Sequence, residues 1–381
     1  MRIYIIAGEA SGDLHAANFV KELKLLDPTV ELRGWGGDLM EQAGVTVVKH
    51  YSELAFMGFI EVVKNLRTIF KNLKACEEDI KAFKPDAVFM VDYPGFNLRI
   101  AKKISARAGT DGRPLNVKIF YYISPQVWAW KQSRVHQIKQ LVDKMFVILP
   151  FEKPFYKKFD YDVEFVGHPL LDAIEQFKQT KQEDFRLKNN LDDRKIIALL
   201  PGSRKQEILV KLPLMLSVVD QFPGYQFVVA AAPSLPLSFY DQFKIPQKVS
   251  VVSGQTYGLL SSAFAALVTS GTATLETALF NVPEVVCYKG NAVSYQIAKR
   301  LVKVPYISLV NLIAGKEVVK ELIQAELNTA NIAAELKKIT QNEANRARLL
   351  DEYAQLRQSL GGSGASKNVA NAVFKSLQHL S

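Results

Sequence analysis

The sequence predicts an α/β fold of two doubly wound domains, each with a parallel sheet covered by helices. Short runs rich in Val and Ile alternate with longer segments of helical pattern, and this alternation breaks after Pro150 before it resumes. The length of 381 residues points the same way, because it exceeds one core of usual size and suits two domains of roughly 150 to 200 residues.

The β-branched runs give the expected strands of both halves. In the first half, strands are expected at 3–7, 45–48, 87–91, 117–123 and 145–149. In the second half, they are expected at 195–200, 226–231, 249–252, 265–269 and 284–288. A helix is expected to follow the first strand, from about Leu14 to Leu26. The pattern indicates two Rossmann-like halves in series, with ligands expected beyond the carboxyl ends of the strands.

The domain boundary is expected near His168, where a short Gly-His-Pro stretch precedes a polar run. We therefore assign 1–168 to the first domain and 169–344 to the second. The tail is rich in Ala, Leu, Glu and Lys, which predicts helices, and the helices at about 345–381 are expected to pack on the first domain. The stretch Gly361–Gly364 predicts a hinge before the last of them.

The composition excludes several classes of protein. With 48% apolar and 23% charged residues, the chain does not have the composition of a disordered protein. The first apolar run is only five residues long and no run reaches about 18, so we expect neither a signal peptide nor a spanning helix, but a cytosolic protein. Cys76 and Cys287 lie far apart without a CxxC spacing, which favours buried thiols.

Metal chemistry is not favoured by the sequence. The five histidines show no HxxxH or His/Cys grouping, so a zinc site is not expected. One DxD spacing, which some metal-dependent transferases use to hold a diphosphate, occurs at Asp160–Asp162, just before an expected short strand near the domain junction. The net charge of +10 fits nucleic acid, an anionic membrane or phosphorylated small molecules, and does not choose among them.

In the first half, two segments after strands carry candidate chemistry. The loop Gly8–Asp13 contains Glu9 and Ser11 and leads into a helix, so it can approach a hydroxylated or anionic ligand or can be a plain capped turn. Asp92 ends the strand 87–91 before a proline turn, where it can act as a general base or as a helix cap. The tryptophans of Ser124–Trp130, after the next strand, are by default core anchors.

In the second half, two loops suit a phosphate. Ser203 and Arg204 follow the strand 195–200, where free amides and a forked guanidinium can bind a diphosphate, although a surface arginine in an ordinary turn is the alternative. The turn Ser270–Thr272 opens a helix whose N-terminus favours an anion. Glu276, one turn further, can accept hydrogen bonds from a ribose diol or simply favour the helix dipole.

Seven motifs occur in the order typical of the lipid-A-disaccharide synthase family, and the chain resembles that family over nearly its whole length. They are Gly8–Asp13, Asp92–Asn97, Ser124–Trp130, Phe165–Pro169, Leu200–Arg204, Ser270–Glu276 and 301–312. The resemblance implies a GT-B fold, in which two Rossmann-like domains face an interdomain cleft. It also implies an inverting, metal-independent glycosyltransferase that needs no cofactor and joins UDP-2,3-diacylglucosamine to 2,3-diacylglucosamine 1-phosphate. The products are the β-1,6-linked lipid A disaccharide, a lipopolysaccharide precursor, and UDP.

The resemblance also assigns roles to particular residues. Asp92 is the expected general base, and Glu9 and Ser11 are expected to face the sugar groups. A homodimer with exchanged C-terminal helices is implied as well. The residues expected to bind the UDP moiety are Ser203, Arg204, Ser270, Gly271, Thr272, Glu276 and Asn311.

The diacylated substrates suggest a role for the segment 54–74, which has the pattern of a basic amphipathic helix. Lys64, Arg67, Lys71 and Lys74 flank an apolar face, so the helix can lie on an anionic membrane or can pack on the sheet. We expect the protein to be peripheral on the cytoplasmic face of the inner membrane. The residues expected to contact the membrane or acyl chains are Phe56, Met57, Phe59, Val63 and Phe70.

Two alternatives from other classes remain. A UDP-sugar 2-epimerase, or another GT-B transferase, has the same architecture but would not make a disaccharide from two acylated substrates. A nucleic-acid-binding protein would require a clustered basic face interleaved with aromatic residues, whereas the basic residues here are spread along the chain. We therefore expect no nucleic acid as a partner.

Overall fold

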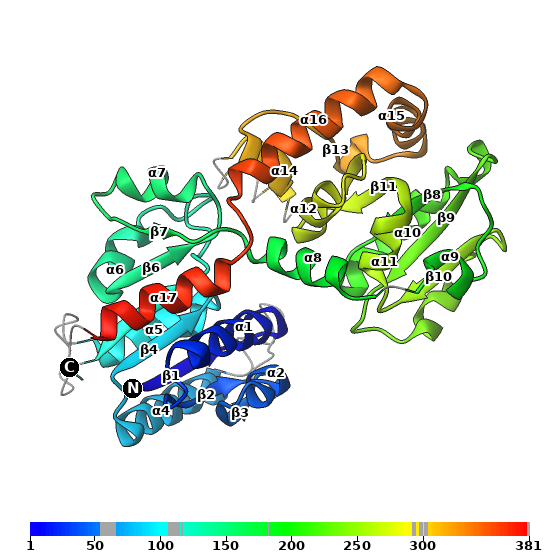
Figure 1. Cartoon of the computed structure of the whole chain (residues 1–381). Coiled ribbons are helices and arrows are strands. Elements are labelled where there is room, and N and C mark those ends of the chain that lie inside the picture. The colour runs from blue at the N-terminus through cyan, green and yellow to red at the C-terminus, as the bar shows by residue number, and fades with distance from the viewer. Residues whose placement is uncertain are drawn as a thin grey trace. The chain divides into compact units, whose positions relative to one another are not determined.

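The computed structural model describes residues 1–53, 66–105, 115, 117–181, 183–291, 295–296, 300 and 304–378. The chain forms two compact units. The first consists of Met1–Asp172 together with Leu360–Ser381, and the second of Ala173–Ser359. Each has its own parallel sheet with helices around it (Figure 1).

The first unit is built on a seven-stranded parallel sheet of order β3-β2-β1-β4-β5-β6-β7. The strands are β1 (Arg2–Ala7), β2 (Glu31–Gly36), β3 (Thr46–His50), β4 (Ala87–Val91), β5 (Lys118–Tyr122), β6 (Lys144–Val147) and β7 (Glu164–Phe165). The helices are α1 (Ala10–Leu26), α2 (Asp38–Gln42), α4 (Leu66–Phe83), α5 (Pro94–Ile104), α6 (Arg134–Leu141), α7 (Glu152–Lys157) and α17 (Ala365–Gln378), with a 3₁₀ turn η1 (Tyr51–Glu53).

Both faces of this sheet are covered, which explains its apolar strands. Along β1, Ile3 and Ile5 pack into one core cluster, whereas Tyr4 and Ile6 pack into another. All residues of β4 are buried. Burial on both faces removes the polar alternation of a half-exposed strand, so the strand reads as one apolar run.

The second unit repeats the plan with a six-stranded parallel sheet of order β10-β9-β8-β11-β12-β13. The strands are β8 (Lys195–Leu200), β9 (Tyr225–Ala231), β10 (Val249–Ser253), β11 (Ala263–Thr269), β12 (Glu284–Tyr288) and β13 (Lys320–Ile323). The helices are α9 (Phe185–Lys188), α10 (Lys205–Leu216), α11 (Thr256–Ser262), α12 (Thr272–Leu279), α14 (Leu309–Ala314), α15 (Thr329–Gln341) and α16 (Glu343–Ser359), with 3₁₀ turns η3 (Val219–Gln221), η4 (Leu237–Gln242) and η5 (Gln324–Glu326).

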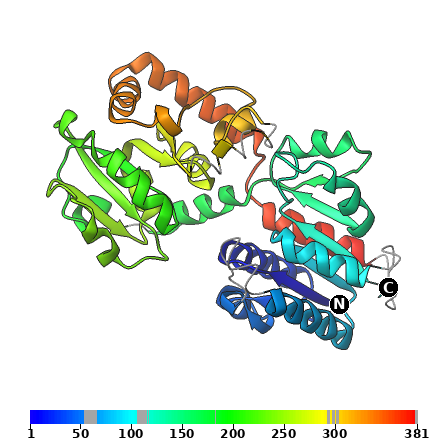
Figure 2. The same cartoon turned by 180° about the vertical axis from the view of Figure 1, so that it is seen from behind.

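The chain passes between the units within α8 (Pro169–Gln179) and again after α16. The first passage, after Asp172, lies four residues beyond the expected boundary at 168. Of the tail expected to pack on the first domain, α17 does so and lies on α1 (Figures 1 and 2). Its Val369 and Val373 are buried. α16 instead packs on α12, α14 and α15 of the second unit, because Leu349, Tyr353 and Leu356 are buried there.

Within the described parts of the chain, helices long and apolar enough to cross a bilayer do not occur.

Candidate functional site

Asp92 lies where the strand order of the first sheet reverses, between β1 and β4. Asp92 and Tyr93 follow β4 with φ of +43° and +46°, a left-handed conformation that is unfavourable for side chains of this size. Hydrogen bonds hold the turn in place. The Asp92 N–H donates to the Tyr122 carbonyl (2.9 Å), and the Asp92 carbonyl accepts from Asn97 Nδ2 (2.7 Å) and from the Tyr121 hydroxyl.

The surroundings of Asp92 suit a general base. Burial raises the pKa of Asp92 to about 6, and the nearby charge of Glu9 adds to the rise, while a hydrogen bond from the Tyr93 N–H opposes it. A carboxylate with a raised pKa is a stronger base than an ordinary aspartate, yet it is still ionised at neutral pH. Asp92 can therefore accept a proton from a weakly acidic hydroxyl.

This pKa predicts the acid side of the pH profile. Because the base must be ionised and its pKa is raised to about 6, kcat/KM should fall about tenfold per pH unit below pH 6 and level off above about pH 7. The measurement is kcat/KM for group transfer between pH 4.5 and 8 in the wild type and Asp92→Asn. If kcat/KM instead falls with an apparent pKa near 4, or falls in the same way in Asp92→Asn, Asp92 is not the group that causes the fall.

The loop after β1 reaches the same edge of the sheet. Glu9 is exposed as the residue before α1, and Ser11 is exposed in the first turn of that helix. α1 thus begins at Ala10, earlier than the expected Leu14. Gly8 has no room for a side chain, because a Cβ would lie 2.2 Å from the Tyr93 ring. The first unit therefore brings Glu9 and Ser11 to the edge that carries Asp92.

Asp13, at the end of the same motif, has a structural role. It is buried, and its carboxylate accepts hydrogen bonds from the N–H groups of Gly37 (2.8 Å), Leu39 (3.1 Å) and Met40 (3.1 Å). The N-terminus of α2 is thereby capped by a residue of α1. The Gly8–Asp13 motif thus has exposed residues at Glu9 and Ser11 and a buried structural residue at Asp13.

The second unit has a cavity of 220 Å³ at the matching position, where its strand order reverses between β8 and β11. The buried Thr269 Oγ1 at its wall has no hydrogen-bond partner among the described residues. Ligands of open α/β sheets bind at such switch points. The lining residues are Leu200, Gly202, Ser203, Glu207, Ala230, Ala231, Ala232, Pro233, Thr256, Thr269, Ser270, Gly271, Thr272, Ala273 and Glu276.

One wall of this cavity is the turn between β8 and α10. Gly202 has φ of +122° and lies against Glu207, so that a Cβ there would be 2.5 Å from Glu207 Oε2. Ser203 lines the cavity. Arg204, the next residue in the sequence, does not line it; it is exposed and directly precedes α10. The described residues offer no acidic partner to Arg204. Its guanidinium is thus available to an anion.

The opposite wall is the turn between β11 and α12. Gly271 has φ of +148°, a backbone angle that only glycine adopts without strain, although a Cβ there would meet no other atom. The Ser270 hydroxyl donates to the Ile307 carbonyl (2.8 Å) and so fixes the turn. Thr272 begins α12, whose first amides point out of the helix, as the N–H groups of any first turn do. Free amides and the positive end of the helix dipole make an anion site.

Glu276 completes the cavity one turn into α12. Burial raises the pKa of Glu276, and a hydrogen bond from the Tyr257 hydroxyl to Glu276 Oε1 (3.1 Å) opposes the rise. The Tyr257 ring is fixed in turn, since its centroid lies 5.5 Å from that of Phe177 and 5.1 Å from that of Phe280. Tyr257 thus orients the carboxylate through one oxygen, and the second oxygen can accept a hydrogen bond from a hydroxyl group.

Removing the Tyr257 hydroxyl should therefore weaken nucleotide binding without changing chemistry. Tyr257→Phe keeps the ring but loses the hydrogen bond that orients Glu276, and we expect the Kd of UDP to rise roughly 2- to 10-fold, as for loss of one ordinary hydrogen bond, with kcat retained. Calorimetric titration with UDP measures this. Tyr225→Phe, at the amino end of β9, is the matched control. Equal Kd values for wild type and Tyr257→Phe would contradict this role.

Asn311 was expected to bind the donor, but the structure gives it internal partners. It is fully buried in α14, at 0% exposure. Its Oδ1 accepts from the N–H groups of Val318 (2.8 Å) and Val319 (2.9 Å), and its Nδ2 donates to the Val319 carbonyl (2.9 Å) and to Glu321 Oε1 (2.9 Å).

Glu321, which the sequence did not single out, extends this network to the cavity. Its carboxylate accepts from the N–H groups of Ile307 and Ser308, and the Ile307 carbonyl accepts the Ser270 hydroxyl. Asn311 is therefore linked through Glu321 and Ile307 to the turn Ser270–Thr272. The only sequence signal for Glu321 was an acidic residue inside a short apolar stretch.

Asn311→Leu should cost stability, because it leaves two N–H groups and the Glu321 carboxylate short of partners. With ~1–3 kcal/mol for each buried group left unpaired, the free energy of unfolding should fall by at least ~3 kcal/mol. Urea denaturation measures this change. A loss below about 1 kcal/mol would show that the network in the structure is not formed in solution.

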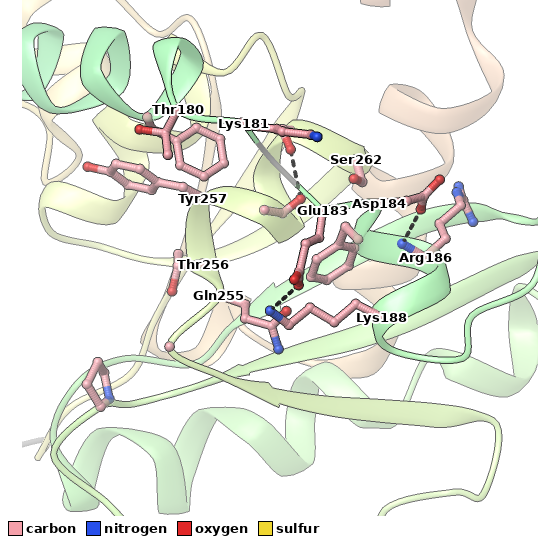
Figure 3. Close-up of a pocket in the computed structure, with 16 residues that line it drawn as sticks. Thr180, Lys181, Glu183, Asp184, Arg186, Lys188, Gln255, Thr256, Tyr257 and Ser262 are labelled. Carbon is pink, nitrogen blue, oxygen red and sulfur yellow. Dashed lines mark hydrogen bonds and ion pairs between the residues drawn. The ribbon is translucent and has the colours of Figure 1, made fainter.

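A larger pocket of 950 Å³ adjoins the 220 Å³ cavity of the second unit, and Pro233 and Thr256 line both. Figure 3 shows Gln255, Thr256 and Tyr257 along one side of it and charged residues of the segment before α9 along the other. The Gln255 amide is already paired reciprocally with Asn189 (both 3.1 Å). A nucleotide with its ribose at Glu276 can extend past Thr256 into this space.

The expected membrane segment lies mostly outside the described residues, and this holds for Phe56, Met57, Phe59 and Val63. Phe70 on α4 is described and is 66% exposed, whereas Leu73, on the core side of the same helix, is buried. The exposed face of α4 also carries Arg67, Lys71 and Lys74. The described end of the segment thus packs on the sheet and still presents an aromatic residue among cations.

In the described part of the chain, His, Cys, Asp and Glu do not gather in groups of three or more that could hold a metal ion.

Taken together, the two parallel sheets and the nucleotide-suited cavity are those of a sugar-nucleotide enzyme. Residues 3–373 match the family model described as lipid-A-disaccharide synthetase. Relatives named lipid-A-disaccharide synthase include one from Syntrophus aciditrophicus, 41% identical over 375 residues (97% of this chain, 96% of the relative). Another, from Geobacter metallireducens, is 39% identical over 386 residues (99% and 97%). The chain belongs to the lipid-A-disaccharide synthase family and is a glycosyltransferase.

Solved structures share the fold at low identity. A UDP-GlcNAc 2-epimerase from Neisseria meningitidis, bound to UDP-GlcNAc, has a TM-score of 0.66 at 15% identity and covers 98% of this chain, with all of its own length matched (100%). The calicheamicin glycosyltransferase CalG4 has a TM-score of 0.58 at 17% identity and covers 100% of this chain and 99% of its own. These likenesses confirm the expected GT-B fold, while the family assignment favours the disaccharide synthase over the epimerase.

Proposed function

We propose that the chain transfers a diacylglucosamine unit from UDP-2,3-diacylglucosamine to 2,3-diacylglucosamine 1-phosphate, with inversion, to give a β-1,6-linked disaccharide and UDP. Membership in the family supports the substrates, which are a UDP-sugar and a lipid A precursor. In this reaction, Asp92 takes the proton of the acceptor 6-hydroxyl as that oxygen attacks the anomeric carbon of the donor, and the bond from this carbon to the diphosphate breaks.

The observation that carries the proposal is the 220 Å³ cavity of the second unit, which is lined by two glycine turns and the N-terminus of α12. Leaving UDP gains negative charge on its diphosphate, and this charge is stabilised by the first amides of α12, by the Gly202–Ser203 turn and by Arg204. Glu276, oriented by Tyr257, accepts the ribose hydroxyls. Because these groups supply the positive charge, the proposal requires no metal and no cofactor. Glu9 and Ser11 contact the sugar on the side of Asp92.

The test is to mix the purified protein with both acylated substrates in the presence of EDTA and to analyse the products. We expect the disaccharide and one equivalent of UDP. A loss of activity in EDTA that Mg²⁺ restores would contradict the metal-independent mechanism. Conversion of the UDP-sugar alone, without disaccharide, would instead indicate the epimerase.

We further propose that the protein is peripheral and acts at the cytoplasmic face of the inner membrane, where its lipid substrates reside. The exposed Phe70 among the cations of α4 supports this. Phe70→Ser should reduce sedimentation with vesicles that contain phosphatidylglycerol. Leu187→Ser, which removes a leucine that is 78% exposed on the second unit, should not. Equal sedimentation of wild type and Phe70→Ser would refute the role of Phe70.

We also propose a homodimer in which the C-terminal helices are exchanged. The Gly361–Gly364 stretch, with positive φ at both ends, supports a change of chain direction before α17. The same α1 surface that holds α17 in one chain can receive that of a second copy. Light scattering should give twice the mass of 42.7 kDa, and deletion of residues 360–381 should abolish the dimer. A monomer at micromolar concentration would contradict exchange.

A further inference from the structure

The loop between β5 and α6 has a firmly anchored base. Ser124 is buried, and its hydroxyl lies 2.6 Å from that of Tyr156. Trp128 is also buried, with its ring edge-on to Phe151 at 5.0 Å between centroids. The expected role of a tryptophan as a core anchor therefore holds for Trp128.

Trp130, two residues further, does not follow this pattern. It is 47% exposed, and two cations lie over its ring: Lys131 Nζ is 4.4 Å from the ring centroid, and Arg134 Cζ is 5.8 Å away. Gln132 Nε2 donates to the Trp128 carbonyl (3.3 Å), and this hydrogen bond holds the turn 128–132, which carries Trp130. The exposed end of the loop is thus an aromatic face with two positive charges.

Some cations of the first unit are paired with acids, but these two are not paired with any described acid. Lys103 pairs with Glu77 at 2.6 Å and Lys157 with Asp162 at 3.0 Å, whereas Lys131 and Arg134 form no ion pair with any described residue. Arg134 is also partly buried, and it begins α6, whose helix dipole adds positive potential at this end. Like charges gathered without an acid repel one another, and a bound anion would relieve this repulsion.

The loop also lies at the edge that carries Asp92. β5 is the neighbour of β4 in the sheet, and the Asp92 N–H donates to the carbonyl of Tyr122, the last residue of β5. The segments that carry Asp92 and Trp130 therefore leave adjacent strands at their carboxyl ends.

We propose that Lys131, Arg134 and the face of Trp130 form an anion subsite that binds the phosphate group of the acceptor lipid. This inference rests on the proposed function. An arginine fork and a lysine together match a phosphate monoester, and the tryptophan ring holds both cations in place and gives the adjoining sugar an apolar surface. The subsite selects a phosphorylated acceptor while Asp92 acts on its hydroxyl.

The test compares two acceptors, 2,3-diacylglucosamine 1-phosphate and the same lipid without phosphate, in detergent micelles. For the double variant Lys131→Ala/Arg134→Ala, kcat/KM with the phosphorylated acceptor should fall roughly 10- to 100-fold, the order expected from losing charge-assisted hydrogen bonds. With the phosphate-free acceptor, the double variant and the wild type should agree within about twofold. Lys102→Ala, an exposed cation of α5, is the matched control and should resemble the wild type with both acceptors.

An equal loss with both acceptors would overturn the inference, because the loop would then serve the site in general. A loss that appears only with phosphatidylglycerol vesicles, in parallel with reduced sedimentation, would also overturn it and assign the cations to the lipid surface. Absence of disaccharide from the wild type with the phosphorylated acceptor would instead refute the proposed function, so the two failures are distinguishable.

Discussion

Asp92→Asn should lower kcat by about 10²- to 10⁴-fold, the range that a positioned general base contributes. The amide cannot accept the proton of the attacking hydroxyl, although it has nearly the shape of the carboxylate. The backbone groups of Asp92 hold the turn, and the amide oxygen of Asn can still accept from the Tyr93 N–H, so the fold should be retained. Single-turnover kinetics with both substrates measure the effect.

The same variant should bind UDP with the affinity of the wild type, since UDP is assigned to the second unit. Asp86→Asn is a matched control, because Asp86 lies at the opposite end of the same strand, where it accepts from the Arg2 N–H (2.7 Å). That control should keep full turnover. A fall of less than about threefold in Asp92→Asn would remove Asp92 from the mechanism.

Arg204→Ala should lower kcat by about 10²- to 10³-fold, as for removal of one preorganised donor from a developing anion. Arg204 directly follows Gly202 and Ser203, which line the 220 Å³ cavity, and it forms no ion pair with any described acid. The effect should fall on kcat more than on the affinity for UDP-sugar, because the diphosphate gains charge as it leaves. Steady-state kinetics with both substrates separate the two.

Two further variants sharpen this prediction. Arg204→Lys keeps the charge but loses the planar fork, so its kcat should lie between those of Arg204→Ala and the wild type. Lys205→Ala removes the neighbouring exposed cation and should leave kcat unchanged. If both alanine variants lost activity equally, the general charge of the segment rather than Arg204 would be responsible.

Most strands of the fold could be predicted because burial on both faces leaves a continuous apolar signal. The strands β4, β8 and β12 begin and end where the sequence placed them. β2 was missed because Glu31–Gly36 lacks β-branched residues, and its Gly34 is required by packing that only the structure shows: a Cβ there would lie 1.9 Å from the Ile5 carbonyl oxygen. β13 was missed because it is short and begins with Lys320 and Glu321.

The candidate site could be predicted where residues directly follow strands. The strand pattern indicated that Asp92 and the Ser270–Thr272 turn follow strands, whereas only the strand order of the structure shows that both lie at switch points. Contacts made over long sequence distances could not be inferred. The Tyr257 hydroxyl reaches Glu276 from a different helix, and Asn311 acts through Glu321, because each partner is fixed by tertiary packing and not by spacing. The motif order indicated Asn311 as a site residue, but it did not show that the side chain makes all its hydrogen bonds inside the second unit.

The most direct test of the mechanism is a crystal structure of the protein with UDP and the phosphorylated acceptor bound. We predict that the UDP diphosphate lies on the N-terminus of α12 with its ribose hydroxyls on Glu276. An Asp92 oxygen should lie about 2.6–3.2 Å from the acceptor 6-hydroxyl. UDP bound away from α12, or a 6-hydroxyl that contacts some other base, would contradict the account.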